Sequence, residues 1–325
     1  MAISLAELVA RQPVLLAPMA GITDLPFRRL VARFGAGLVT SEMVASRELL
    51  GAAAAARARA ELAGGARPAA VQIVGREAAV MAEAARLCVD QGAELIDINM
   101  GCPARKVTGG LSGSALMRDP DHALRLIEAV VAAVPVPVTV KMRLGWDDTS
   151  RNAALIARRA EAAGVAMVTI HGRTRCQFYS GRADWAAIAE VVRAVTIPVV
   201  ANGDITDAAS ARAALSASAA AAVMVGRAAR GAPWILARIA AGLAGGTVPA
   251  APSGDALCDL ISEHYEEMLR FYGTEIGLRV ARKHLGWYLA PLGMEALRAE
   301  LVRLEDPARV LAGLRRGFSE LEAAA

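Results

Sequence analysis

The chain has 325 residues and a formal net charge of +4, and 55% of its residues are hydrophobic whereas only 4% are aromatic. This composition excludes a disordered chain, and the length suits one large domain followed by a smaller one. Uncharged apolar runs stay shorter than the roughly 18 residues of a membrane span. The N-terminus carries Glu7 and lacks the basic start of a signal peptide. We therefore expect a cytoplasmic protein without membrane contact.

The predicted elements begin with eight apolar, β-branched runs that recur along the chain. Stretches of helical periodicity separate most of them, and several of these end at a glycine. Continuous apolar strands that alternate with helices predict a parallel sheet covered on both faces. Eight such units predict an α/β fold, a (β/α)₈ TIM barrel over residues 1–245. The runs span residues 14–21, 37–43, 69–75, 94–101, 136–145, 167–173, 197–205 and 222–228.

The rest of the chain has a different pattern. Beyond Gly245 and Gly246, the stretch TVPAAPSGD is typical of a linker. The residues after it show helical periodicity only, with breaks at Pro291 and Pro307. We expect residues 246–325 to form a small C-terminal all-helical domain.

Cysteine usage argues against a metal or a disulfide framework. Cys88, Cys102, Cys176 and Cys258 form no CxxC pair and have no histidines at metal-ligand spacing. The small positive net charge permits an anionic partner without identifying one.

Polar residues follow nearly every predicted strand. Catalytic side chains of a TIM barrel lie at these ends, and a barrel built only for stability would not need them there. The last two ends, ANGD and VGRA, are typical of a phosphate site made by backbone N–H groups, to which Arg227 would add charge. The strand-end residues are Pro18, Met19, Ala20, Gly21, Glu42, Gln72, Asn99, Cys102, Lys141, Arg143, His171, Arg173, Asn202, Gly203, Asp204, Gly226 and Arg227.

Three of these residues leave alternatives open. Lys141 could place a fixed cation against an electron-rich ligand such as a reduced flavin, or could extend to water. His171, with Arg173 beside it, is predicted to contact a ligand rather than to be a satisfied core histidine. Cys102 could be a buried small hydrophobe, a nucleophile or a general acid, and the glycine-rich TGGLSGSAL after it suggests a mobile loop that closes over a substrate.

The motifs together resemble those of the tRNA-dihydrouridine synthases, most closely the bacterial B-type. The resemblance runs over nearly the whole chain, and one departure is Thr108-Gly109-Gly110, where some relatives are expected to carry a basic residue that contacts RNA. It rests on LAPMAGITDLPFR, SEM, VQIVG, DINMGCPARKV, SGSALMRDP, VKMRLGW, IHGRTR, VANGDI, VMVGRAARGAPWI and LRVARKHLGWYL.

The resemblance implies a bound FMN, reduced by NADPH or NADH, that passes hydride to C6 of a D-loop uridine in tRNA, at position 17 for the B-type. It implies that Cys102 protonates C5 and that Asn99 holds the uracil edge, and we expect Arg173 to contact the substrate. The matching FMN-binding residues are Pro18, Met19, Ala20, Gln72, Lys141, His171, Asn202, Gly203, Asp204, Gly226 and Arg227.

The helical domain is expected to bind tRNA. A uridine in the tRNA elbow must leave its stack to enter a barrel mouth, which calls for a wide phosphate-binding surface. The segment RVARKH, with Arg282 and Lys283, is a candidate, although charged helical faces are usually only solvated. We expect a monomeric enzyme with no metal.

Two alternatives remain. The chain could be an FMN barrel dehydrogenase that acts on a free pyrimidine, but such a substrate needs no helical domain. It could also be a non-catalytic RNA-binding or regulatory protein, and the presence of Cys102, Lys141 and His171 argues against this.

Overall fold

The computed structural model describes residues 4–62 and 68–323. Eight parallel strands form one sheet in the order β1-β8-β7-β6-β5-β4-β3-β2, so that each strand lies beside its neighbours in the sequence. The strands are β1 (Val14–Leu16), β2 (Thr40–Ala45), β3 (Ala70–Val74), β4 (Leu95–Met100), β5 (Val138–Arg143), β6 (Met167–His171), β7 (Val199–Asn202) and β8 (Ala222–Val225).

The sheet closes between its first strand and the residues that precede β2. Leu16 pairs in parallel with Val39, and the Leu16 N–H donates to the carbonyl oxygen of Leu38 at 2.8 Å. The predicted TIM barrel is therefore confirmed. The run predicted for the second strand, 37–43, begins earlier than β2 because its first residues pair with β1 instead of extending the ladder with β3.

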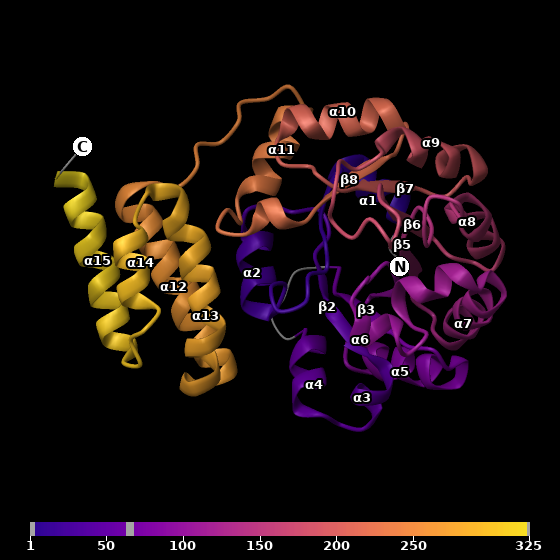
Figure 1. The fold of residues 1–325 in the computed structure, drawn as a ribbon, viewed down its shortest axis with the longest axis horizontal. Helices are drawn as coiled ribbons and strands as arrows, with labels where there is room; N and C mark the ends of the chain where they lie inside the picture. Colours follow the sequence, from indigo (N-terminus) through magenta and orange to yellow (C-terminus); the bar gives the residue numbers. More distant parts are fainter. Residues whose placement is uncertain (1–3, 63–67, 324–325) are drawn as a thin grey trace.

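Helices surround the strands (Figure 1). They bury one apolar face against the sheet, as in α7, where Ala123, Leu126, Ile127 and Val130 are buried. The helices of the barrel region are α1 (Leu5–Arg11), α2 (Leu25–Arg33), α3 (Ser46–Leu50), α4 (Ala54–Ala60), α5 (Ala78–Asp90), α6 (Arg105–Thr108), α7 (Pro120–Ala133), α8 (Ala153–Ala162), α9 (Trp185–Ala194), α10 (Ala208–Ser218) and α11 (Ile235–Leu243).

Aspartate caps begin several of these helices. The side chains of Asp24, Asp119, Asp184 and Asp207 each accept the backbone N–H three residues further on, at the starts of α2, α7, α9 and α10. Such a cap stabilises a helix by about 0.5–2 kcal/mol. The caps fix where each helix begins, and hence how long the preceding strand-to-helix loop is.

The glycine-rich segment after Cys102, which we expected to be a mobile loop, contains helical turns and packed residues beside exposed ones. Arg105–Thr108 forms α6, and Gly113–Arg118 forms a 3-10 helix whose first five residues are buried. The Ser114 hydroxyl and N–H donate to the carbonyl oxygen of Cys102 at 2.8 and 3.2 Å. The second half of the segment is thus packed and bonded to the cysteine, and exposure centres on Leu111.

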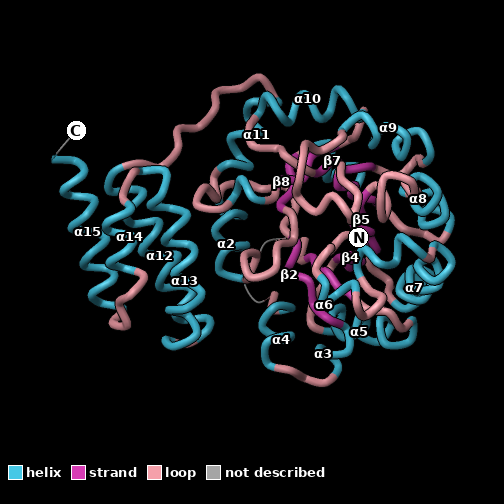
Figure 2. Tube along the Cα trace, in the orientation of Figure 1, coloured by secondary structure: helices cyan, strands magenta, loops and turns pink. Residues whose placement is uncertain are grey.

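The C-terminal region is helical, as predicted. It follows residues 244–253, which contain neither helix nor strand, and lies beside the barrel against α2 (Figure 2). Tyr265, Leu285, Leu314 and Phe318 are among the residues that form its own core. Its helices are α12 (Gly254–Tyr272), α13 (Thr274–Leu289), α14 (Glu295–Leu301) and α15 (Pro307–Ala323).

A buried aromatic cluster joins this region to the barrel. The ring of Phe27, on α2, lies 5.8 Å from His264 of α12 and 5.7 Å from His284 of α13, and the two imidazole centres are 4.9 Å apart. Next to it, the Tyr272 hydroxyl donates to Asp24 at 3.1 Å. Arg33 and Glu263 pair at 2.6 Å at the exposed edge of the contact.

None of the helices in the described part of the chain combines the length and the apolar composition that crossing a bilayer requires.

Candidate active site at the barrel mouth

Two adjoining cavities open at the carboxyl ends of the strands. The first, of about 410 Å³, lies at the ends of β7 and β8, and the second, of about 480 Å³, lies at the ends of β3, β4 and β5. The residues that line both are Pro18, Met19, Lys141, His171, Tyr179, Arg227 and Arg230.

The structure brings most of the predicted site residues into these cavities. Asn202, Gly203, Asp204 and Gly226 line the first, and Ala20, Gln72, Asn99 and Cys102 line the second. Each residue matched to FMN binding therefore lines at least one of the two cavities. Of the predicted substrate residues, Asn99 lies in the second cavity, whereas Arg173, Arg282 and Lys283 line neither.

Lys141 is a half-buried cation between the cavities. Its ammonium donates to the side-chain oxygen of Asn202 at 3.1 Å, and the Asn202 amide nitrogen donates to the Met224 carbonyl at 2.8 Å. Burial lowers the pKa of Lys141 to about 8, with a further contribution from Arg143. Among the described residues this is the one hydrogen bond of the ammonium, so two of its three N–H groups remain for a ligand.

His171 is held as a neutral ring at the end of β6. Burial lowers the pKa of His171 well below its usual value, and the cations around it, Lys141 first, act in the same direction. Its Nε2 lies 3.4 Å from a guanidinium nitrogen of Arg173. Because a guanidinium can only donate, Nε2 accepts and the ring proton is on Nδ1.

Arg173 does not occupy the position that we expected. Its side chain is about 2% exposed and points into the loop after β6, where it donates to the carbonyls of Ser180 (3.1 Å) and Gly181 (2.7 Å). It also pairs with Asp204 at 2.5 Å. Arg173 therefore holds the loops after β6 and β7 together behind His171, rather than presenting its charge to the cavities.

The end of the first cavity suits an anion. Gly203 has a φ of +116°, and a Cβ there would lie 2.8 Å from both His171 and Ala183, so only glycine fits. Burial alone would raise the pKa of Asp204, but Arg173 and Arg227 are among the partners that lower it overall. The cavity lining includes the cations Lys141, Arg227 and Arg230 but only one carboxylate, Asp204, so it carries an excess of positive charge.

Asn99 connects the second cavity to the cysteine. Its side-chain oxygen accepts the backbone N–H groups of Gly101 (3.1 Å) and Cys102 (2.9 Å). Its amide nitrogen donates to the side-chain oxygen of Gln72 at 2.7 Å. The half-buried Cys102 is thus anchored through its main chain and lies in the cavity wall.

Tyr179 is a functional candidate that the sequence analysis missed. Its side chain is 53% exposed in the wall of both cavities, and the Arg227 guanidinium lies 4.9 Å from its ring centre. The residue is in an irregular loop after β6 without periodicity to mark it. The signal available in the sequence was an aromatic residue in the loop that follows a predicted strand.

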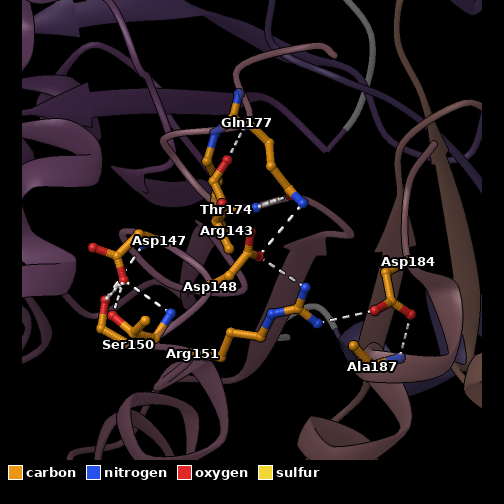
Figure 3. Close-up of polar contacts among 10 residues, drawn as sticks. Arg143, Asp147, Asp148, Ser150, Arg151, Thr174, Gln177, Asp184 and Ala187 are labelled. Atoms are coloured by element: carbon orange, nitrogen blue, oxygen red, sulfur yellow. Dashed lines mark hydrogen bonds and ion pairs between the residues drawn. The ribbon is translucent and has the colours of Figure 1, made fainter. Parts of the chain in front are cut away.

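Contacts from Arg143 and Arg151 support the loop that carries Tyr179. Arg143, at the end of β5, donates to the carbonyls of Gly101 (2.8 Å), Thr174 (2.9 Å) and Phe178 (2.8 Å). Figure 3 shows Arg143 near Thr174, whose N–H donates to the Gln177 side chain at 2.8 Å. In the same view Arg151 bridges Asp148 and Asp184, at 2.9 Å each. The loop that carries Tyr179 is therefore held in one shape.

The two predicted tRNA residues on α13 have different surroundings. Lys283 faces the barrel, since a Cβ on Gly21 would lie 3.2 Å from its Nζ. The half-buried Arg282 instead has a buried Nε without a hydrogen-bond partner in the described part of the chain. Lys283 is therefore close to Gly21 at the barrel mouth, whereas part of the Arg282 guanidinium is buried.

Comparisons with known proteins agree with this arrangement. The family model described as "Dihydrouridine synthase (Dus)" matches residues 15–322. A probable tRNA-dihydrouridine synthase of Rhodobacter capsulatus is 68% identical over 100% of both chains. A probable tRNA-dihydrouridine synthase of Rhizobium leguminosarum bv. phaseoli is 56% identical over 94% of each chain. tRNA-dihydrouridine synthase B of Pseudomonas aeruginosa is 47% identical over 94% of this chain and 93% of its own.

Proposed function

This chain belongs to the dihydrouridine synthase family, and we propose that it is a flavin-dependent tRNA-dihydrouridine synthase that reduces a D-loop uridine. The family match and the relatives' names support the activity on tRNA. One observation carries the proposal furthest: Cys102, Asn99, Lys141 and His171 line the same cavity at the barrel mouth.

FMN fits the residues that line the two cavities. The cationic end at Arg227 and Arg230 suits a phosphate, and the unfilled N–H groups of Lys141 suit the electron-rich edge of a flavin ring. The neutral His171 would hydrogen-bond the same ring, and Gln72 would contact it from the second cavity. When bound, FMN would supply the hydride, taken from NADPH or NADH, that adds to C6 of uracil.

Cys102 would hold the proton that C5 receives. Its main chain is tied to Asn99 and Ser114, so the thiol has a defined place at the cavity wall. A thiol that stays protonated near neutral pH can act as a general acid. Asn99 would bind the uracil edge, and Arg173 would act as a positioning residue through His171 and the adjoining loops.

The region 246–325 would bind the tRNA. Lys283 lies next to the barrel mouth at Gly21, where a phosphate beside the flipped uridine would pass, and Arg282 would contribute a more distant charge. By subfamily resemblance the target is uridine 17. We propose that the enzyme works as a monomer in the cytoplasm, where its substrate is found.

The proposal is tested with the purified protein and tRNA from a strain that lacks this gene. With NADPH, wild-type protein should form dihydrouridine in that tRNA, detected by nuclease digestion and mass spectrometry, and free uracil should remain unchanged. Reduction of free uracil without tRNA would favour the dehydrogenase alternative. A purified protein that holds no yellow chromophore and leaves the tRNA unmodified would favour the non-catalytic alternative.

A further inference from the structure

A buried carboxylate, Asp97, lies beside the site and has no role in the function proposed above. It is 6% exposed on β4, two residues before Asn99 and on the same side of that strand. One of its oxygens accepts the hydroxyl of Thr139 at 2.6 Å, and the other accepts the amide nitrogen of Gln72 at 2.6 Å. Asp97 is thus connected to the residues that line the second cavity.

The hydrogen bonds form a chain with a single direction. An ionised carboxylate only accepts, so Gln72 must turn its NH₂ group toward Asp97 and its oxygen toward Asn99. The Gln72 oxygen then accepts from the Asn99 amide nitrogen at 2.7 Å. This leaves the Asn99 oxygen to accept the N–H groups of Gly101 and Cys102. The Asp97 carboxylate lies at one end of this series of hydrogen bonds, and the backbone N–H groups of Gly101 and Cys102 lie at the other. Both ends therefore require the same orientation of the Gln72 and Asn99 side chains.

The negative charge of Asp97, which sets this direction, interacts with the positive charge of Lys141. Burial raises the pKa of Asp97 to about 6, while the hydrogen bonds from Thr139 and Gln72 and the charge of Lys141 act against that rise. Lys141 in turn lines both cavities. A buried carboxylate that interacts with the charge of Lys141 can fix the direction of its hydrogen bonds in a way that a neutral residue of the same shape cannot.

We propose that Asp97 is a positioning residue whose carboxylate fixes the donor–acceptor orientation of the Gln72 and Asn99 side chains, and through Asn99 the place of Cys102. The inference rests on the proposed function and deepens it. The Asn99 amide nitrogen has two hydrogens and donates one of them to Gln72, so it keeps one N–H for a ligand. The cavity then offers a donor there, which matches a ring carbonyl of uracil and opposes the amino group of cytosine.

Exchanging the carboxylate between neighbours tests this assignment. Asp97→Asn removes the obligate acceptor, and the new amide can face Gln72 with either end. Combining Asp97→Asn with Gln72→Glu restores a carboxylate, now at position 72. This carboxylate accepts one hydrogen bond from the amide introduced at position 97 and one from Asn99. The double variant thereby keeps the buried charge and every hydrogen bond. Gln72→Glu alone places two carboxylates in contact, and Asp121→Asn, an exposed carboxylate on α7, is the matched control.

The rate of flavin reoxidation by saturating tRNA is the first readout. We expect Asp97→Asn to lower it by about tenfold or more, because a charge-assisted hydrogen bond is replaced by a weaker neutral one. The apparent tRNA affinity should stay within about twofold, since tRNA binding depends on other surfaces. The double variant should react faster than either single variant, and Asp121→Asn should match the wild type.

The alkylation rate of Cys102 in the flavin-free full chain is the second readout, followed by peptide mass spectrometry. It should rise in Asp97→Asn and return toward the wild-type rate in the double variant. A wild-type reoxidation rate in Asp97→Asn, or a double variant as slow as Asp97→Asn, would overturn the inference. If Asp97→Asn does not fold, folding of the double variant supports the inference and its failure to fold overturns it. A wild-type protein inactive on tRNA would instead refute the proposed function.

Discussion

The backbone N–H of Cys102 donates to the side-chain oxygen of Asn99 at 2.9 Å, and this bond joins the cysteine to the end of strand β4. The Cys102 carbonyl is held from the other side by Ser114. Both bonds use the main chain and leave the thiol free. The cysteine is therefore placed by its backbone while its side chain remains available for chemistry.

Arg227 is expected to hold the flavin phosphate. Arg227→Ala should lower the flavin content of the purified protein, because this half-exposed side chain contributes charge to the first cavity rather than core packing. The ratio of flavin to protein absorbance after dialysis measures the effect. Arg193→Ala, an exposed arginine on α9, is the control and should retain the wild-type ratio. Equal flavin-to-protein absorbance ratios in the two variants would show that Arg227 does not hold the flavin phosphate.

Lys283 is expected to contact a tRNA phosphate next to the barrel mouth. Lys283→Ala should weaken tRNA binding and reduce the slope of log affinity against log salt by roughly 0.7–0.9, the value for one phosphate contact. Binding measured between low and moderate salt gives both quantities. Arg282→Ala, tested separately, should have the smaller effect on the slope because its guanidinium is partly buried. An unchanged affinity and slope for Lys283→Ala would show that Lys283 is exposed to solvent and does not contact tRNA.

The buried histidines between the two regions should make stability depend on pH. Burial lowers the pKa of His264 to about 3, and that of His284 well below its usual value. The neutral forms are favoured in the folded state, so their stabilisation is complete above pH 6.5 and is lost as pH falls below it. Between pH 7.5 and 5.5 each histidine should lower the free energy of unfolding by about 1.4 kcal/mol.

Urea unfolding of the holoenzyme at the two pH values measures this loss. His284→Leu should lose its share of the pH dependence, and the difference from the wild type isolates this histidine from the other titrating groups. His122→Gln on α7, away from the interface, should keep the wild-type dependence. Identical pH dependence in wild type and His284→Leu would show that His284 is not held neutral in the folded protein.

Much of the barrel could be predicted from the sequence, because buried parallel strands have continuous apolar runs and functional groups follow them. Asn99, Cys102 and Lys141 come directly at such ends, and they do line the cavities. The position of Arg173 at the end of a strand could be predicted from the sequence, but the direction of its side chain could not. A guanidinium there can point into the cavity or bond to the carbonyls of its own loop. The structure shows the second arrangement.

The irregular segments were the least predictable. The glycines and serines after Cys102 suggested mobility, yet Ser114 uses its small size and its hydroxyl to pack and bond beneath the cysteine. Tyr179 gave no periodic signal because its loop is held by tertiary contacts from Arg143 and Arg227 rather than by a local pattern. Asp97 was not identified because its role depends on two neighbouring strands.

The most direct test of the central claim follows the two half-reactions separately in Cys102→Ala by rapid-mixing absorbance at the flavin band. If Cys102 is the acid that protonates C5, NADPH should reduce the bound flavin at the wild-type rate. Reoxidation by tRNA should then be slower by about 10²–10⁴-fold, the usual contribution of a positioned general acid. An unchanged rate of reoxidation by tRNA, or loss of NADPH oxidation with flavin still bound, would contradict the account.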